Sequence, residues 1–106
     1  MSVFSFLKEN AGKNSSFAQG IAQAQNTKGA ILLDVRTPQE YAGGHIAGSV
    51  NVPLDKIAQI SAKKDAPLFV YCLSGARSGQ ACAYLQGLGY HATNIGGISG
   101  YHGPLE

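Results

Sequence analysis

The run Cys72-Leu73-Ser74-Gly75-Ala76-Arg77-Ser78 combines a thiol, a glycine and a cation within a short stretch. It follows the apolar segment 68–71, which has the pattern of a buried strand, and it precedes a segment with helical periodicity, so Cys72 stands where a helix begins. The first N–H groups of a helix lack partners and carry partial positive charge, so they stabilise an anion. Here that anion would be the thiolate of Cys72, which is the reactive form of a cysteine.

Gly75 and Arg77 strengthen the interpretation of Cys72 as a reactive thiol. Gly75 permits backbone angles that side chains forbid, so successive N–H groups can converge on the sulfur. Arg77 lies near a helix start, where the macrodipole disfavours a cation, so an anion or a carboxylate partner is expected for it. We expect Arg77 to clamp the loop, to hold an anion, or both. A lone cysteine would more often be a core residue, but the combination favours chemistry.

Apolar runs alternate with short amphipathic segments, which predicts an α/β domain with a largely parallel sheet. Helices are expected at 16–25, from Thr37 onward, at 54–60 and at 78–88, and strands at 30–34, 50–52, 68–72 and 91–95. Thr37 has the position of an N-cap and Glu40 that of a capping-box glutamate. In the helix at 78–88, Ala81, Leu85 and Leu88 should share the inner face.

Asp34 and Cys72 both stand at the carboxyl ends of expected strands. Open α/β sheets bind ligands at that edge, so Asp34, Arg36 and Glu40 are expected near the cysteine loop. Their expected roles are structural. Asp34 and Arg36 can neutralise each other or tie the first loop to the sheet, while Glu40 caps a helix. His45, flanked by glycine and isoleucine, is also expected to be structural rather than a general base.

Two blocks of the sequence, one after the other along the chain, carry a family resemblance. The first is 33–41, continuing through 44–49 to 51–53, and the second is the 72–78 loop followed by Asn94-Ile95-Gly96-Gly97. With this content the chain resembles the single-domain rhodaneses, a family of sulfurtransferases, from about residue 17 to 101. The resemblance implies a rhodanese-like domain at 15–106 with a small, largely parallel sheet flanked by helices. Residues 1–14 would then form a tail or a short docked helix.

The resemblance also implies a function, that of a thiosulfate:cyanide-type sulfurtransferase. Catalytic Cys72 would take the outer sulfur of thiosulfate or a persulfide, hold it as a cysteine persulfide, and pass it to cyanide or to a thiol, including a thiol on a protein. The loop that binds the substrate and the persulfide would be Leu73, Ser74, Gly75, Ala76 and Arg77, supported by Asp34, Arg36 and Glu40. No metal and no organic cofactor is expected. Dedicated thiosulfate enzymes of this type often have a further basic residue in the loop, so thiosulfate is expected to be a poor donor here.

Two alternatives to a sulfurtransferase remain open on the sequence. The domain is also compatible with a non-catalytic module that carries persulfide or binds a protein. A phosphatase or arsenate reductase is disfavoured, because phosphatase-like loops place five residues between cysteine and arginine, whereas four separate Cys72 from Arg77. The tighter loop suits a single sulfur atom better than a phosphate.

Composition excludes several other classes of protein. With 106 residues and a formal charge of +2, the chain has room for one core and has no basic cluster beyond Lys63-Lys64, so no nucleic-acid partner is expected. The apolar segment 3–7 is too short for a signal peptide and no stretch reaches membrane-spanning length, so a cytoplasmic protein is expected. Cys82 falls in the helix after Cys72, too far along it for a disulfide. It is expected to be a packing residue, with a redox role left open.

Overall fold

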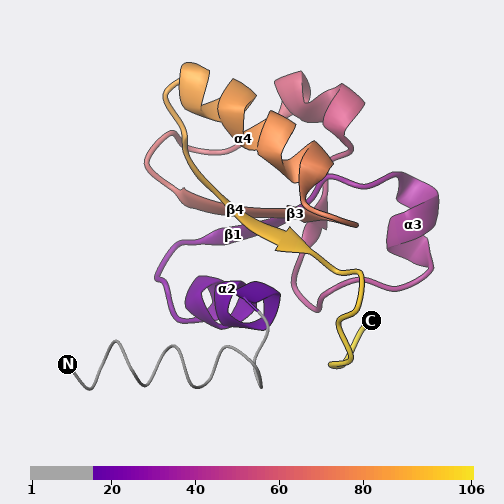
Figure 1. The fold of residues 1–106 in the computed structure, drawn as a ribbon. Coiled ribbons are helices and arrows are strands. Elements are labelled where there is room, and N and C mark those ends of the chain that lie inside the picture. The colour runs from indigo at the N-terminus through magenta and orange to yellow at the C-terminus, as the bar shows by residue number, and fades with distance from the viewer. Residues whose placement is uncertain (1–15) are drawn as a thin grey trace.

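A four-stranded parallel sheet with helices on both faces forms the core of the protein (Figure 1). The computed structural model describes residues 16–106, and the strand order is β2-β1-β3-β4. The helices are α2 (Ser16–Gln25), α3 (Pro38–Ala42), the 3-10 helix η1 (Leu54–Gln59) and α4 (Ala76–Gly87), and the strands are β1 (Ile31–Asp34), β2 (Val50–Asn51), β3 (Pro67–Cys72) and β4 (His91–Gly97). The predicted α/β fold with a parallel sheet is confirmed. The predicted tail, residues 1–14, lies outside the described residues.

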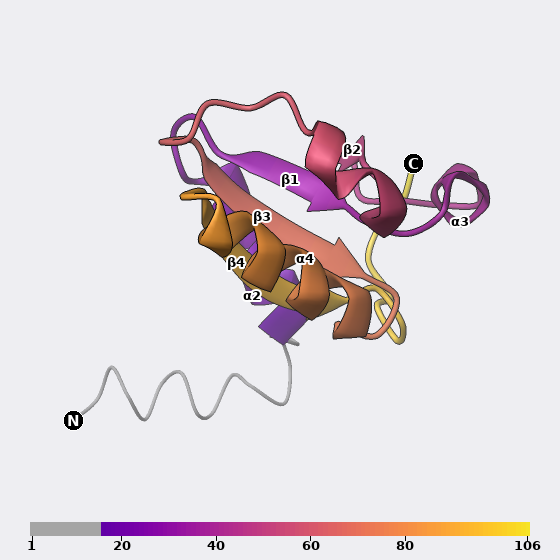
Figure 2. The same ribbon diagram turned by 90° about the horizontal axis from the view of Figure 1, so that it is seen from above.

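Alternation along β3 divides the core into two layers. Leu68, Val70 and Cys72 face one side of the sheet, where they pack with residues of α4. Phe69 and Tyr71 face the other side and pack with residues of α2. Figure 2 shows α4 lying along β3 and β4, and Figure 1 shows α2 beneath the sheet. The parity of β3 therefore directs the Cys72 side chain toward the layer that contains α4.

Local sequence signals explain the buried face of α2 and the start of α3. In α2 the predicted inner face is confirmed, because Phe17, Ile21 and Ala24 are all buried. At the start of α3 the Thr37 hydroxyl accepts from the Glu40 N–H at 3.1 Å, and Glu40 Oε1 accepts from the Thr37 N–H at 2.9 Å. This reciprocal capping box is the one predicted, and it fixes the position of Glu40.

Two features of α4 differ from the prediction. The helix begins at Ala76 rather than at 78, because Gly75 takes the N-cap position with a left-handed φ of +101°. Leu88 is not on the inner face. It is the C-cap residue and is 45% exposed, while the buried face consists of Ser78, Ala81, Cys82 and Leu85. Other bounds differ by one or two residues. The strand β4 runs on to Gly97, β2 ends at Asn51 and η1 ends at Gln59, while β1 begins at Ile31, β3 begins at Pro67 and α4 ends at Gly87.

The strands point toward α3, and the loop from β3 to α4 lies at this same carboxyl edge (Figures 1 and 2). This arrangement brings the segment after β1 and the loop after β3 together, because parallel strands end at a common edge. Among residues 16–106, no helix is both long and apolar enough to cross a membrane.

Candidate active site

Cys72 is the last residue of β3 and is fully buried, with its thiol at the base of the following loop. The Gly75 N–H donates to Cys72 Sγ at 3.0 Å and the Ser78 N–H does so at 3.4 Å. The Ser78 hydroxyl lies 3.4 Å from the same sulfur. Two main-chain donors from the start of α4 therefore point at a single sulfur atom, which is the convergence that the sequence predicts, and one hydroxyl lies against it.

These donors overcome the effect of burial on the thiol. Burial alone would raise the pKa of Cys72, because it disfavours the charged form. The hydroxyl and N–H of Ser78, with the N–H groups of Gly75 and Ser74, favour the thiolate, and the net result is a pKa below the ordinary value. The thiolate at this position is therefore favoured more than that of an ordinary cysteine, and the N–H groups hold it in a fixed direction.

Two glycines allow the loop to close around the sulfur. Gly75 has a left-handed φ of +101°, a conformation that a side chain would strain, and it turns the N–H of this residue inward. Gly97, at the end of β4, packs directly on the loop backbone, since a Cβ there would overlap the carbonyl oxygen of Leu73. The N–H groups of Ile98 and Ser99 donate to the carbonyls of Cys72 and Leu73 at 2.9 and 3.0 Å. The end of β4 therefore braces one side of the loop.

Ser78 and Asn94 are functional candidates that the sequence-based list of site residues omitted. Ser78 is fully buried, and its hydroxyl donates to Asn94 Oδ1 at 2.7 Å while lying against Cys72 Sγ. The Asn94 amide nitrogen donates to the Gly75 carbonyl at 3.0 Å, and Oδ1 also accepts from the Gly96 N–H at 2.9 Å. One side chain of β4 thus positions both the hydroxyl and the glycine of the loop. The available sequence signal was the spacing of Ser78, directly after the loop arginine, from Ala81, Cys82 and Leu85, which places it on the buried face of the helix.

Arg77 has the carboxylate partner that its position predicts. Its two terminal nitrogens donate to Glu40 Oε1 at 2.7 Å and to Oε2 at 3.0 Å, which makes a bidentate pair. The hydrogen bond from Arg77, with that from Thr37, lowers the pKa of Glu40 to about 2. The pair joins the first turn of α4 to α3, so Arg77 clamps the loop. Donor binding by Arg77 stays a prediction, since Glu40 already occupies the guanidinium.

Asp34 and Arg36 neutralise each other, as expected. Arg36 donates from Nε and Nη2 to the Asp34 carboxylate at 2.7 to 3.0 Å, and both side chains are almost fully buried. Arg36 also donates to the Gly44 carbonyl at 2.8 Å, and Asn51 donates to the carbonyls of Asp34 and Arg36 at 3.0 Å. The pair therefore ties the segment after β1 to β2 and to the end of α3. No hydrogen bond or ion pair in the structure joins it to the cysteine loop.

The remaining predicted residues have simple positions. Leu73, Ser74 and Ala76 are exposed on the outer side of the loop. His45 has local partners, because Nδ1 is 2.8 Å from the Tyr41 carbonyl oxygen and the ring stacks on Tyr41. The structural interpretation of His45 is therefore confirmed.

Cys82 is a free thiol on the inner face of α4. It is 4% exposed and belongs to the same apolar cluster as Cys72, which confirms its role in packing. Burial raises the pKa of Cys82 to about 11. In the described part of the chain, no group of three His, Cys, Asp or Glu side chains is placed to hold a metal ion.

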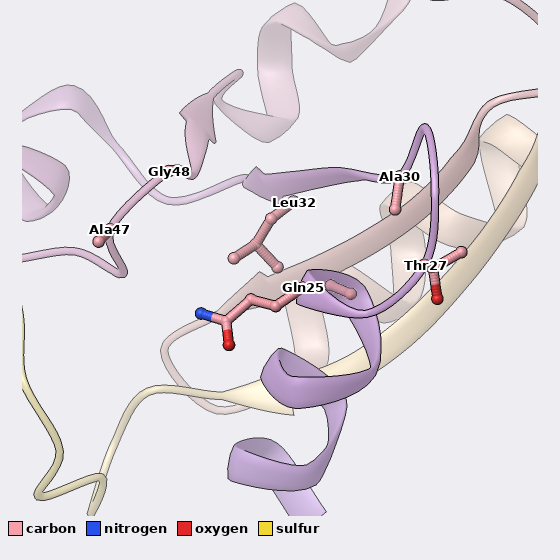
Figure 3. Close-up of a pocket in the computed structure, with 7 residues that line it drawn as sticks. Gln25, Thr27, Ala30, Leu32, Ala47 and Gly48 are labelled. Atoms are coloured by element: carbon pink, nitrogen blue, oxygen red, sulfur yellow. The ribbon is translucent and has the colours of Figure 1, made fainter.

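A hollow of about 250 Å³ opens between the end of α2, β1 and the Ala47-Gly48 turn (Figure 3). Gln25, Thr27 and Leu32 line it, and it shares no residue with the cysteine loop. A second hollow of about 300 Å³ adjoins the loop at Ser74 and is bounded by Gly97 and Tyr101. This second hollow shares Ser74 with the cysteine loop.

Comparison with known proteins assigns the class. The family model described as the rhodanese-like domain matches residues 17–103, so the chain belongs to the rhodanese-like domain family. Its sequence is 40% identical over 81 residues to the thiosulfate sulfurtransferase GlpE of Pseudomonas entomophila, covering 74% of this chain and 72% of that protein. It is 39% identical over 71 residues to the thiosulfate sulfurtransferase PspE of Escherichia coli, covering 62% of this chain and 68% of that protein.

Solved structures agree with the sequence relatives. A rhodanese with anions from E. coli superposes with a TM-score of 0.65 at 34% identity, covering 73% of this chain and 96% of that one. A rhodanese-like domain protein from Staphylococcus aureus gives a TM-score of 0.75 at 29% identity, covering 85% and 92%. The rhodanese-like fold inferred from the two sequence blocks is therefore confirmed.

Proposed function

We propose that this protein is a rhodanese-type sulfurtransferase that carries sulfane sulfur as a persulfide on Cys72. The observation that carries the proposal is the convergence of the Gly75 and Ser78 N–H groups on a buried Cys72 Sγ. The names of the relatives support it, since sequence relatives near 40% identity are called thiosulfate sulfurtransferases.

In the first half of the proposed reaction, the Cys72 thiolate attacks the outer sulfur of a sulfane donor. With thiosulfate as the donor, a bond forms between Cys72 Sγ and that sulfur, and the bond from it to the sulfonate sulfur breaks. The electron pair of the broken bond leaves with sulfite. The enzyme then holds one added sulfur atom and one negative charge, now on the outer sulfur.

In the second half, the acceptor attacks that outer sulfur and the Cys72 thiolate leaves. Cyanide would become thiocyanate, and a thiol on a small molecule or a protein would become a persulfide. The loop amides suit both states, because they favour an anion whether it is the thiolate or the outer sulfur of the persulfide. The proposed reaction needs no metal and no organic cofactor, because the transferred sulfur stays covalently bound to Cys72.

The test is the intact mass of the reduced protein before and after exposure to excess thiosulfate and, separately, to an alkyl hydropersulfide. Wild type should gain one sulfur, with an equal amount of sulfite from thiosulfate, and should lose it again when cyanide is added. Cys72→Ser keeps Cys82 and serves as the control that should gain nothing. Absence of a gain with both donors would contradict the proposal.

The second half of the reaction separates an enzyme from a module that only carries persulfide. Loaded protein is mixed with cyanide or with a small thiol, and repeated turnover is followed as thiocyanate or persulfide release. Multiple turnovers per Cys72 are expected for the enzyme. Loading without turnover would favour the non-catalytic alternative instead.

A further inference from the structure

The side chain of Asn94 is fully engaged in hydrogen bonds around the cysteine loop, although the residue is exposed. Its Nδ2 donates to the Gly75 carbonyl at 3.0 Å, while Oδ1 accepts from the Ser78 hydroxyl at 2.7 Å and from the Gly96 N–H at 2.9 Å. An amide oxygen has two lone pairs, and both are used here. Because an exposed asparagine contributes little to the core, the effect of this amide falls on the loop.

Ser78 carries a single hydroxyl proton, and three acceptors lie near it. Asn94 Oδ1 is 2.7 Å from Ser78 Oγ, whereas Cys72 Sγ and the Gly96 carbonyl oxygen are each 3.4 Å from it. The contact to Asn94 has the usual length of an O–H···O bond, so this bond holds the proton. With the proton on that side, Ser78 turns a lone pair toward the sulfur. A thiol at Cys72 can donate to this lone pair, but a thiolate cannot.

The charge on Cys72 Sγ changes during the proposed reaction. In the free enzyme Sγ carries the negative charge of the thiolate, which attracts the Ser78 hydroxyl proton strongly. In the persulfide the charge lies on the outer sulfur, and the neutral Sγ is a weak acceptor. The attraction of the sulfur for this proton therefore alternates, while Gly75 and Gly96 hold the Asn94 amide in place.

We propose that Asn94 is a positioning residue that accepts the Ser78 hydroxyl when Cys72 carries sulfur and releases it when Cys72 is a free thiolate. This inference rests on the proposed function and adds a residue to it. When the acceptor attacks the outer sulfur, the bond from that sulfur to Cys72 Sγ breaks and its electron pair returns to Sγ. The hydroxyl then turns from Asn94 Oδ1 to Sγ and stabilises the leaving thiolate. The proton stays on Ser78 throughout, so no acid or base is consumed.

The first test is a double-mutant cycle with Asn94→Ala, Ser78→Ala and the double variant, followed through the pH dependence of Cys72 alkylation. Asn94→Ala leaves the hydroxyl free to donate to the thiolate, which lowers the pKa of Cys72. It also removes the bond to the Gly75 carbonyl, but this loss is common to both backgrounds and cancels in the cycle. The shift caused by Asn94→Ala should therefore be about half a pKa unit lower when Ser78 is present than when it is alanine. Equal shifts in the two backgrounds, or a difference of the opposite sign, would overturn the inference.

The four proteins of this cycle share the same groups that can carry charge near the reactive thiol. Arg77, which Glu40 holds, acts on the thiol through its charge, and Cys82 lies in the same apolar cluster. Thr93→Ala is the matched control, because Thr93 is an exposed neighbour of Asn94 on the opposite side of β4. It should shift the alkylation profile equally with and without the Ser78 hydroxyl. A dependence on the hydroxyl as large as that of Asn94→Ala would contradict a specific role for Asn94.

The second test measures the ratio of loaded to free Cys72 at equilibrium in a fixed mixture of thiosulfate and sulfite, by intact mass at a pH above the pKa of Cys72. Asn94→Ala removes the hydroxyl's partner in the persulfide, so the ratio should fall about threefold, which corresponds to half a pKa unit. In the Ser78→Ala background the same change should leave the ratio within about 1.5-fold. Asn94→Asp keeps an oxygen that accepts from Ser78 and should keep the ratio at or above that of wild type.

The outcomes of the second test separate the role of Asn94 from the proposed function. A purely structural role of Asn94 would lower the temperature of thermal unfolding, but its effect on the ratio would not depend on Ser78. Wild type that loads sulfur, with a ratio that Asn94→Ala leaves unchanged, would overturn the role of Asn94 alone. Wild type that does not load sulfur would overturn the proposed function and this inference with it.

Discussion

Two buried cysteines lie ten positions apart in this chain and pack in the same apolar cluster, but their pKa values are shifted in opposite directions. Cys72 sits where α4 begins, and inward N–H groups lower its pKa despite burial. Cys82 sits within α4, where main-chain N–H groups are used by the helix itself, and burial raises its pKa to about 11. The comparison shows that burial by itself makes a thiol inert, and that unpaired helix-start amides reverse the effect.

The largest expected difference between the two thiols is in reactivity. With iodoacetamide at pH 7, wild type should gain one adduct, at Cys72, at least about a hundredfold faster than a second at Cys82, because the rate follows the thiolate fraction. Peptide mapping identifies the site. Cys72→Ser should remove the fast adduct and reduce sulfur loading on the order of a thousandfold or more. Cys82→Ala should leave the rate of the fast adduct and the sulfur loading within about twofold of wild type. Fast labelling of Cys82 would contradict the expected difference between the two thiols.

A smaller effect is expected from the glycine that turns the loop inward. Gly75→Ala strains a φ of +101° and shifts a donor away from Cys72 Sγ, so the pKa of Cys72 should rise by about one unit. The pH dependence of the alkylation rate measures it. Gly89→Ala imposes similar strain at φ +93°, with open space around it at the end of α4. Both variants should lose about 1 kcal/mol of stability, and only Gly75→Ala should change the thiol. A matching shift in Gly89→Ala would assign the effect to stability.

Removal of one hydroxyl should have a smaller effect still. Ser78→Ala deletes the hydroxyl that lies 3.4 Å from Cys72 Sγ but keeps the main-chain donors, so the pKa of Cys72 should rise by less than about one unit. Ser49→Ala is the matched control, since Ser49 is also buried but pairs with the Tyr71 hydroxyl on the other side of the sheet. Alkylation profiles of the two variants against wild type settle the matter. An unchanged pH profile of alkylation in Ser78→Ala would show that the hydroxyl does not affect the pKa of Cys72.

The smallest effect concerns the clamp on the first turn of α4, which has no counterpart at Cys82. The pKa of Glu40 is about 2 in the folded protein and near 4.5 without its partners, so its stabilising contribution is complete above about pH 4.5 and is lost as pH falls toward 2. Because the pair is about one-third exposed, it should contribute only about 1 kcal/mol. Thermal unfolding should show Glu40→Gln less stable than wild type at pH 7 and nearly equal at pH 2. A constant difference at both pH values would show that the charge is not responsible.

Local patterns in the sequence were enough to predict the elements around Cys72. The capping box of Thr37 and Glu40 depends on a spacing of three residues, and the loop from Cys72 to Ser78 joins an apolar strand to a helix. Such signals are contained within one or two turns of the chain, so they can be recognised without the fold. The expected carboxylate for Arg77 followed from the same local reasoning.

Long-range partners could not be predicted in the same way. Glu40 had a complete local role as a cap, and its second role depends on a contact with Arg77 that spans 37 residues. The Asn94 amide reaches Gly75 and Ser78 only because β4 pairs beside β3 in register. Leu88 matched the helical periodicity but fell at the C-cap, where the packed face had already ended. These errors arise where tertiary contacts decide the role of a residue.

The bracing of the loop by β4 separates two properties that an enzyme must otherwise adjust together. Main-chain N–H groups and Ser78 activate the sulfur, and substitution of a side chain elsewhere in the loop cannot delete a main-chain donor. The side chains of Leu73, Ser74 and Ala76 are exposed, and the contribution of Ser74 comes from its main-chain N–H. Exchange of these three side chains therefore changes the surface beside the thiol and leaves the main-chain donors to Cys72 Sγ in place.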